Sequence, residues 1–95
     1  MVKVAINGLG RIGRSFLKIA LDKGINVVAV NDLASIDSIV YLMKYDSVYG
    51  NYKGIIEKGN GFIKLNRKKI MVFSEKQPEN LPWAELGVDI VVECT

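Results

Sequence analysis

Residues 4–14 read VAINGLGRIGR, and this stretch decides the fold of the chain. Its apolar, partly β-branched start is typical of a buried strand. Glycines follow at the spacing Gly-x-Gly-x-x-Gly: Gly8 permits a tight turn, Gly10 leaves room for a pyrophosphate beside the backbone, and Gly13 lets a helix pack closely on the strand. Because a strand precedes the glycines and a helical pattern follows them, they predict a phosphate-binding loop at a helix N-terminus.

Beyond this loop the hydrophobic period becomes that of a helix. One face of the expected helix carries apolar residues at helical spacing, namely Ile12, Phe16, Ile19 and Ala20. Gly24 suits the position just after the helix, because glycine accepts a positive φ. Residues 27–30 (VVAV) then predict a second buried strand. Strand, helix and strand within about thirty residues indicate a βαβ unit with parallel strands.

The rest of the chain is predicted to form one more helix, followed by short strands and turns. A second helix is expected from Ser35, a suitable N-cap, to near residues 44–46. Short antiparallel strands are predicted at residues 54–57, 62–65 and 69–73, with turns at 59–61 and 66–67, and a last buried strand at 88–92. The predicted fold class is therefore α/β: a partial doubly wound (Rossmann) fold, β-α-β-α, with a short antiparallel hairpin region and a final parallel strand.

An acidic residue marks the end of the second predicted strand. Asp32 follows Gly13 by 19 residues, close to the spacing at which a carboxylate accepts hydrogen bonds from an adenosine ribose. The same carboxylate would repel the extra phosphate of NADP, so it favours NAD. A glycine turn without a ligand is the alternative at this point. A P-loop is excluded, because no Gly-Lys-Ser/Thr follows the glycines.

Composition narrows the function further. Ninety-five residues, 49% of them hydrophobic and 24% charged, suit one small globular domain. A net charge of +3 is too small to favour a nucleic-acid partner, and the basic run at 67–69 is interpreted as a charged strand edge. No apolar run approaches the ~20 residues of a membrane span, and no secretory signal is visible, so the cytoplasm is expected.

The chain has no histidine and a single cysteine. Nucleophilic Ser-His and Cys-His pairs and histidine-based metal sites are therefore excluded within these residues. Cys94 ends a predicted strand with no histidine to activate it, so a structural role is expected. No catalytic residue and no metal site is predicted in this chain.

Four stretches together resemble the glyceraldehyde-3-phosphate dehydrogenase family: residues 4–14, 30–33, 42–50 and 81–95. The later stretches are more specific than the glycine pattern, which many dehydrogenases share. The resemblance covers essentially all 95 residues and identifies them as the N-terminal part of a dinucleotide-binding domain. Two departures are Tyr49, where relatives often carry His, and Lys76, where they often carry Arg. Erythrose-4-phosphate dehydrogenase is the alternative within the superfamily, although Asp32 argues against it.

The resemblance implies a cofactor, a reaction and a set of binding residues. The family oxidises and phosphorylates glyceraldehyde 3-phosphate in glycolysis, using NAD and phosphate through a cysteine thioester. Its nucleophilic cysteine and histidine base lie beyond residue 95, and Cys94 lacks their sequence context, so this chain is expected to bind cofactor at most and to be inactive alone. The implied NAD contacts are the pyrophosphate loop, the ribose acid Asp32, the adenine side at Leu33 and Lys76, and the nicotinamide side at Thr95. The loop residues are Asn7, Gly8, Gly10, Arg11, Ile12 and Gly13.

The expected partners are NAD and the remaining half of such an enzyme. If that half is absent, the strand at residues 2–6 should present an unpaired apolar edge, and we expect the chain to dimerise or associate further through it. Self-association without NAD binding is the remaining alternative. No nucleic acid and no membrane is expected as a partner.

Overall fold

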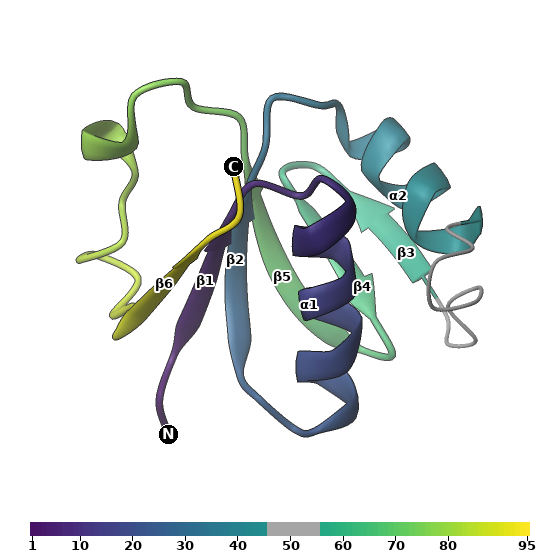
Figure 1. Cartoon of the computed structure of the whole chain (residues 1–95), viewed down its shortest axis with the longest axis horizontal. Coiled ribbons are helices and arrows are strands. Elements are labelled where there is room, and N and C mark those ends of the chain that lie inside the picture. Colours follow the sequence, from purple (N-terminus) through teal and green to yellow (C-terminus); the bar gives the residue numbers. More distant parts are fainter. Residues whose placement is uncertain (46–55) are drawn as a thin grey trace.

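The computed structural model of the chain describes residues 1–45 and 56–95. Its elements in chain order are β1 (Val4–Asn7), α1 (Arg11–Asp22), β2 (Val27–Asn31), α2 (Ile36–Tyr45), β3 (Ile56–Gly59), β4 (Phe62–Leu65), β5 (Lys68–Phe73), the short 3₁₀ helix η1 (Pro78–Asn80) and β6 (Ile90–Glu93). The strands form one sheet in the order β3-β4-β5-β2-β1-β6. Both helices lie along this sheet, α1 in front of its middle and α2 beside β3 (Figure 1).

The parallel part of the sheet confirms the predicted βαβ unit. β1 pairs in parallel with β2 on one side and with β6 on the other, and β2 pairs in parallel with β5. All four residues of β1 are buried. β2 and β6 lie on opposite sides of β1 in the sheet. This arrangement creates a crevice at the carboxyl ends of the strands.

The expectation of an open apolar edge at residues 2–6 is wrong. β6 covers that side of β1 in continuous register, from Val4↔Ile90 to Asn7↔Glu93. The backbone N–H of Lys3 also donates to Asp89 Oδ2 (2.8 Å), which fixes the start of the pairing. The described sheet instead ends at β6, and the prediction of a buried last strand is wrong for the same reason: Ile90 is 51% exposed.

The hairpin region follows the prediction closely. β3 pairs antiparallel with β4, and β4 with β5. Asn66 and Arg67 both have positive φ (52° and 73°), as a two-residue turn between twisted antiparallel strands requires. β5 also pairs in parallel with β2, so this one strand joins the antiparallel and parallel parts. The predicted start of β3 at Gly54 lies outside the described residues.

Helix α1 buries only part of the face that hydrophobicity predicted: Ala20 is buried and Phe16 packs against the core, but the other two predicted residues are exposed. Gly13, Leu17 and Ala20 are its buried residues, whereas Ile12 is 75% and Ile19 42% exposed. The cause is the contact at Gly13, where a Cβ would stand 1.9 Å from the carbonyl oxygen of Gly8. That contact turns the Gly13 side of the helix toward β1, and the residues four and seven positions later follow it into the core.

Helix α2 begins as predicted. The hydroxyl of Ser35 accepts a hydrogen bond from the backbone N–H of Ser38 (3.1 Å), which makes Ser35 the N-cap. The helix is described as far as Tyr45, within the predicted end at residues 44–46, of which Asp46 lies outside the described residues. Its buried side chains, Ile39 and Met43, join a core formed with Ile6, Leu17 and Ile63 among others. Neither described helix is long and apolar enough to cross a membrane.

Candidate functional site

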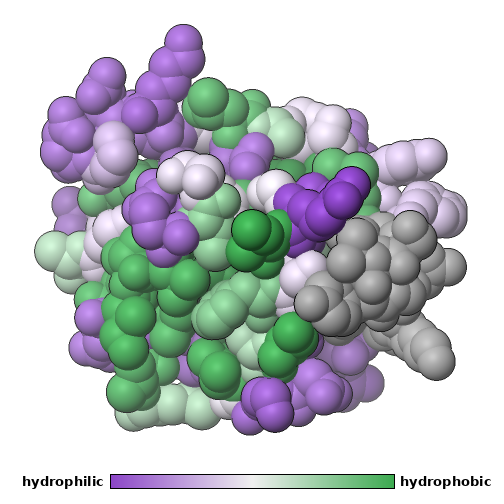
Figure 2. Space-filling view, viewed as in Figure 1, coloured by the Kyte–Doolittle hydropathy of each residue, from purple (hydrophilic) through white to green (hydrophobic). Residues whose placement is uncertain are grey.

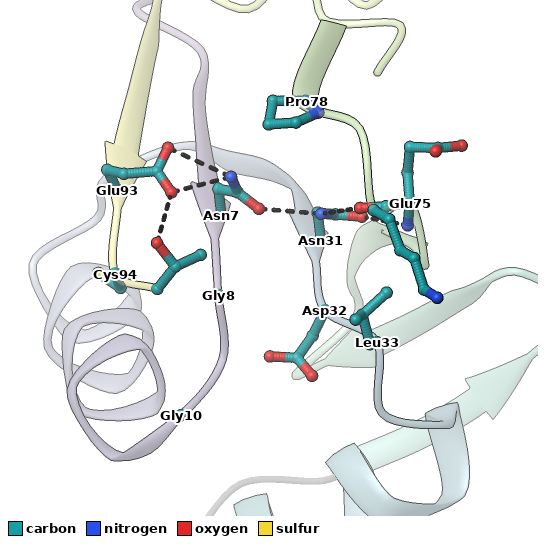
Figure 3. Close-up of a pocket in the computed structure, with 12 residues that line it drawn as sticks. Asn7, Gly8, Gly10, Asn31, Asp32, Leu33, Glu75, Pro78, Glu93 and Cys94 are labelled. Atoms are coloured by element: carbon teal, nitrogen blue, oxygen red, sulfur yellow. Dashed lines mark hydrogen bonds between the residues drawn. The ribbon is translucent and has the colours of Figure 1, made fainter. Parts of the chain in front are cut away.

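A cleft of about 670 Å³ opens at the carboxyl ends of the parallel strands (Figure 3). Its walls come from the ends of β1, β2 and β6 and from the segment after β5. The lining residues are Asn7, Gly8, Gly10, Asn31, Asp32, Leu33, Glu75, Lys76, Pro78, Glu93, Cys94 and Thr95. In open parallel sheets this is the edge at which ligands bind.

The three glycines of the loop meet three different structural demands. Gly8 has a φ of +100°, and a Cβ there would lie 2.9 Å from the backbone of Cys94 and Thr95. Gly13 faces the backbone of Gly8, as described above. Gly10 has a φ of −71°, and a Cβ there would meet nothing within 4 Å. Gly8 and Gly13 are therefore required by packing, whereas at Gly10 the absent side chain leaves open space beside the backbone at the cleft.

The N-terminus of α1 faces the same loop without a side-chain cap. Gly10 is the N-cap residue, no side chain caps it, and the first turn carries no acidic residue. Backbone N–H groups and the helix dipole therefore favour an anion at this end of α1. Arg14 donates from Nη1 to the carbonyl oxygen of Leu9 (3.0 Å) and so holds the loop.

Asp32 is tied to the glycine loop by its own carboxylate. Oδ2 accepts a hydrogen bond from the backbone N–H of Leu9 (2.6 Å), and Oδ1 accepts one from the N–H of Ala34 (2.8 Å). Each carboxylate oxygen has two lone pairs, so both can accept a further donor. The acid thus lines the cleft in a fixed position beside the loop, where hydroxyl donors of a ligand can reach it.

Five cleft residues were not among the predicted cofactor contacts: Asn31, Glu75, Pro78, Glu93 and Cys94. Asn31 and Glu93 have a signal that could have revealed them, since each is the final, polar residue of an otherwise apolar parallel strand. Asn7 holds the same place in β1, and the sheet register sets these three residues side by side. Asn7 and Asn31 are buried polar residues, at 6% and 5% exposure.

The structure gathers most, but not all, of the residues predicted to contact the cofactor. Those lining the cleft are Asn7, Gly8, Gly10, Asp32, Leu33, Lys76 and Thr95. Gly13 lies beneath the loop as a packing residue. Arg11 and Ile12 are exposed in the first turn of α1 and do not line the cleft. The part that each residue plays in binding stays a prediction.

Cys94 lies at the cleft but is not an activated nucleophile. Burial raises the pKa of its thiol, and the neighbouring negative charge of Glu93 raises this pKa further. The thiol is therefore protonated at neutral pH, and the side chain packs against the core cluster. Within the described residues no group of three or more His, Cys, Asp or Glu side chains could hold a metal ion.

Comparison with known proteins agrees with this geometry. The family model described as glyceraldehyde 3-phosphate dehydrogenase, NAD binding domain, matches residues 2–95. Glyceraldehyde-3-phosphate dehydrogenase 1 of Kluyveromyces lactis is 55% identical over 97 residues, which are 100% of this chain and 30% of that protein. The enzyme of Borreliella burgdorferi is 47% identical over 94 residues, 99% of this chain and 28% of its own length. This chain thus spans less than a third of these relatives.

Proposed function

Because the chain belongs to the family of the NAD-binding domain of glyceraldehyde-3-phosphate dehydrogenase, we propose that its cleft holds the adenosine and pyrophosphate part of NAD. One observation carries this assignment: Asp32 Oδ2 is hydrogen-bonded to the Leu9 N–H, inside the glycine loop. The contact fixes this carboxylate beside the open backbone at Gly10, which supports a role for Asp32 in binding the ribose.

Each part of the cleft has a chemical role in this proposal. The open backbone at Gly10 and the uncapped N-terminus of α1 receive the pyrophosphate. The Asp32 carboxylate accepts hydrogen bonds from the adenosine ribose and disfavours the 2′-phosphate of NADP. Leu33 and Lys76 border the adenine, and Thr95 lies toward the nicotinamide half. Arg11 and Ile12, although outside the cleft lining, stay in this proposal as flanking contacts of the loop.

We further propose that the protein to which these residues belong is a cytoplasmic dehydrogenase of glycolysis, which oxidises and phosphorylates glyceraldehyde 3-phosphate. The names of the relatives support this substrate over erythrose 4-phosphate. NAD supplies the hydride acceptor of that reaction. The contribution of the present residues is to bind and orient it, since they include no histidine and their one cysteine is protonated at neutral pH.

Calorimetric titration of the purified chain with NAD, and with NADP in parallel, tests the cofactor assignment. We expect saturable binding of NAD and at least about tenfold weaker binding of NADP, because a phosphate beside an ionised carboxylate costs more than ~1.4 kcal/mol. Circular dichroism of the same sample verifies that the chain is folded. A folded chain that binds both cofactors equally would contradict the role given to Asp32.

A second proposal is self-association through the edge strand β6, because β1 is already paired on both sides. Ile90 and Val91 are exposed on that strand, at 51% and 39%. An apolar groove of about 440 Å³ lies between this strand, the N-terminal residues and Phe16. Figure 2 shows hydrophobic surface gathered over β6 and β1 on this face. We propose that a second copy of the chain pairs with this edge in solution, where no further part of the enzyme covers it.

A further inference from the structure

A chain of side-chain hydrogen bonds crosses the floor of the cleft from β6 to the segment after β5 (Figure 3). Asn7 Nδ2 donates to both carboxylate oxygens of Glu93, at 2.9 and 3.2 Å. Asn31 Nδ2 donates to Asn7 Oδ1 at 2.9 Å. Asn31 Nδ2 also donates to the carbonyl oxygen of Glu75 at 3.1 Å, and Asn31 Oδ1 accepts the Glu75 N–H at 2.9 Å.

The Glu93 carboxylate at one end gives this series of hydrogen bonds a single donor-to-acceptor direction. An ionised carboxylate only accepts hydrogen bonds, so Asn7 must turn its NH₂ group toward Glu93 and its oxygen toward Asn31. Asn31 presents its own NH₂ group to Asn7 and to the Glu75 carbonyl oxygen, and its oxygen to the backbone N–H of Glu75. The backbone of Glu75 therefore requires the same orientation of Asn31 that Glu93 requires through Asn7. Reversal of either amide would set two donors or two acceptors against each other in a buried place, which is costly.

The far end of this hydrogen-bond series, at Glu75, lies in the opposite wall of the cleft. Glu75 and Lys76 line that wall, and Pro78 continues it. The segment has left the sheet after Phe73, so strand pairing no longer holds it; the two bonds to Asn31 give it a fixed position relative to β2. Asp32, the next residue after Asn31, faces the same space. The position of this wall therefore sets the width of the cleft on the adenosine side.

We infer that Glu93, acting through Asn7 and Asn31, is a positioning residue that holds the Glu75–Lys76 wall in place for the adenosine end of the cofactor. Thr95 supports this acid, since its hydroxyl donates to Glu93 Oε1 at 3.1 Å. Glu93 itself belongs to the wall on the other side of β1 and need not touch the adenosine. The adenosine part of this inference rests on the proposed function, whereas the orientation of the amide chain does not.

The first test needs no ligand. Amide hydrogen exchange of the Glu75 N–H is measured by NMR in the wild-type chain and in Glu93→Gln and Glu93→Ala. We expect exchange at Glu75 to accelerate about three- to tenfold in both variants, because Asn7 loses its charged acceptor and then supports Asn31, the partner of the Glu75 N–H, less firmly. The Val72 N–H, which donates to the Gly61 carbonyl oxygen at 2.9 Å, should stay unchanged and show that the sheet is intact.

Glu85→Gln is the matched control, because it removes the same charge from an exposed residue that does not line the cleft. Exchange at Glu75 that is the same in Glu93→Gln, Glu93→Ala and this control would overturn the inference. Similar melting temperatures for all four proteins would show that any change at Glu75 is local.

The second test uses AMP, which contains only the adenosine end of the cofactor. Calorimetry should give an AMP affinity about three- to tenfold weaker in Glu93→Gln than in wild type and in Glu85→Gln. An unchanged affinity, despite faster exchange at Glu75, would refute the positioning of the binding wall. Failure of the wild-type chain to bind AMP would instead refute the proposed function. The exchange measurement would then be the test of whether Glu93 holds Glu75 in place through Asn7 and Asn31.

Discussion

At the scale of single residues, the three loop glycines illustrate how one sequence pattern combines structural and binding requirements. Gly8 and Gly13 sit against backbone atoms, so any side chain there collides with the fold. Gly10 borders open space, and its φ of −71° is accessible to any residue. The loop therefore offers a substitution that separates folding from ligand binding.

Gly10→Ala should leave the chain folded and impair NAD binding, because its Cβ occupies the space through which the pyrophosphate approaches. We expect the affinity for NAD to fall at least about tenfold, with a loss of stability under about 1 kcal/mol. Urea unfolding and calorimetry measure the two effects. Gly8→Ala is the contrasting variant and should lose several kcal/mol of stability, because of its positive φ and its clash with residues 94–95. Equal destabilisation by the two substitutions would contradict this division.

Cys94 allows a second prediction at this scale, based on the raised pKa of its thiol. Iodoacetamide alkylates the thiolate, so the midpoint of the rate–pH profile should lie higher in the folded chain than in the same chain unfolded in urea. Since the folded state favours the protonated thiol, its stabilising contribution is complete below the pKa of the unfolded thiol and is lost as pH rises through the folded value. Glu93→Gln should lower the midpoint only partly, because burial is the larger cause. Identical midpoints in the folded and unfolded chains would disprove this account.

At the scale of secondary-structure elements, α1 shows how a backbone contact overrides hydrophobic periodicity. The predicted apolar stripe contains Ala20, which is buried, but also Ile12 and Ile19, which are substantially exposed. The stripe that begins at Gly13 is buried instead, because only glycine allows the helix to approach the carbonyl oxygen of Gly8. Leu17, one turn later, is fully buried as a consequence.

Alanine substitutions at two apolar positions of α1 should therefore have very different effects. Leu17→Ala should cost about 2–5 kcal/mol, since it removes buried methyl groups and leaves a cavity. Ile12→Ala should change stability by no more than about 0.5 kcal/mol, since that side chain is 75% exposed. Chemical unfolding of both variants measures the difference. A large loss from Ile12→Ala would mean that the hydrophobic stripe, and not Gly13, determines the buried face.

At the scale of the whole molecule, the arrangement of the sheet determines both the cleft and the exposed edge. β1 lies between β2 and β6, so strands extend away from it on both sides and a crevice forms at their carboxyl ends. The same order leaves β6 as the edge of the described sheet. Its exposed Ile90 and Val91 make it the region through which a second copy is proposed to pair.

Light scattering across a concentration series tests this pairing. We expect the wild-type chain to form dimers at high concentration and Val91→Lys to shift it toward the monomer, because a charged side chain on an edge strand opposes pairing. Asn60→Lys, which adds the same charge in the exposed turn between β3 and β4, controls for altered net charge. A wild-type chain that stays monomeric at millimolar concentration would exclude β6 as a self-association edge.

The sequence by itself determined the local features of this protein: the βαβ unit, the glycine loop, the N-cap at Ser35, the two-residue turn at 66–67 and Asp32 after the second strand. These depend on turn chemistry, capping and periodicity, which involve residues close together in the chain. The tertiary structure alone decided the internal position of β1, the buried face of α1 and the amide chain from Glu93 to Glu75. Those features depend on contacts between distant residues, such as Lys3 with Asp89 and Asn7 with Glu93, and no local pattern encodes which strands become neighbours.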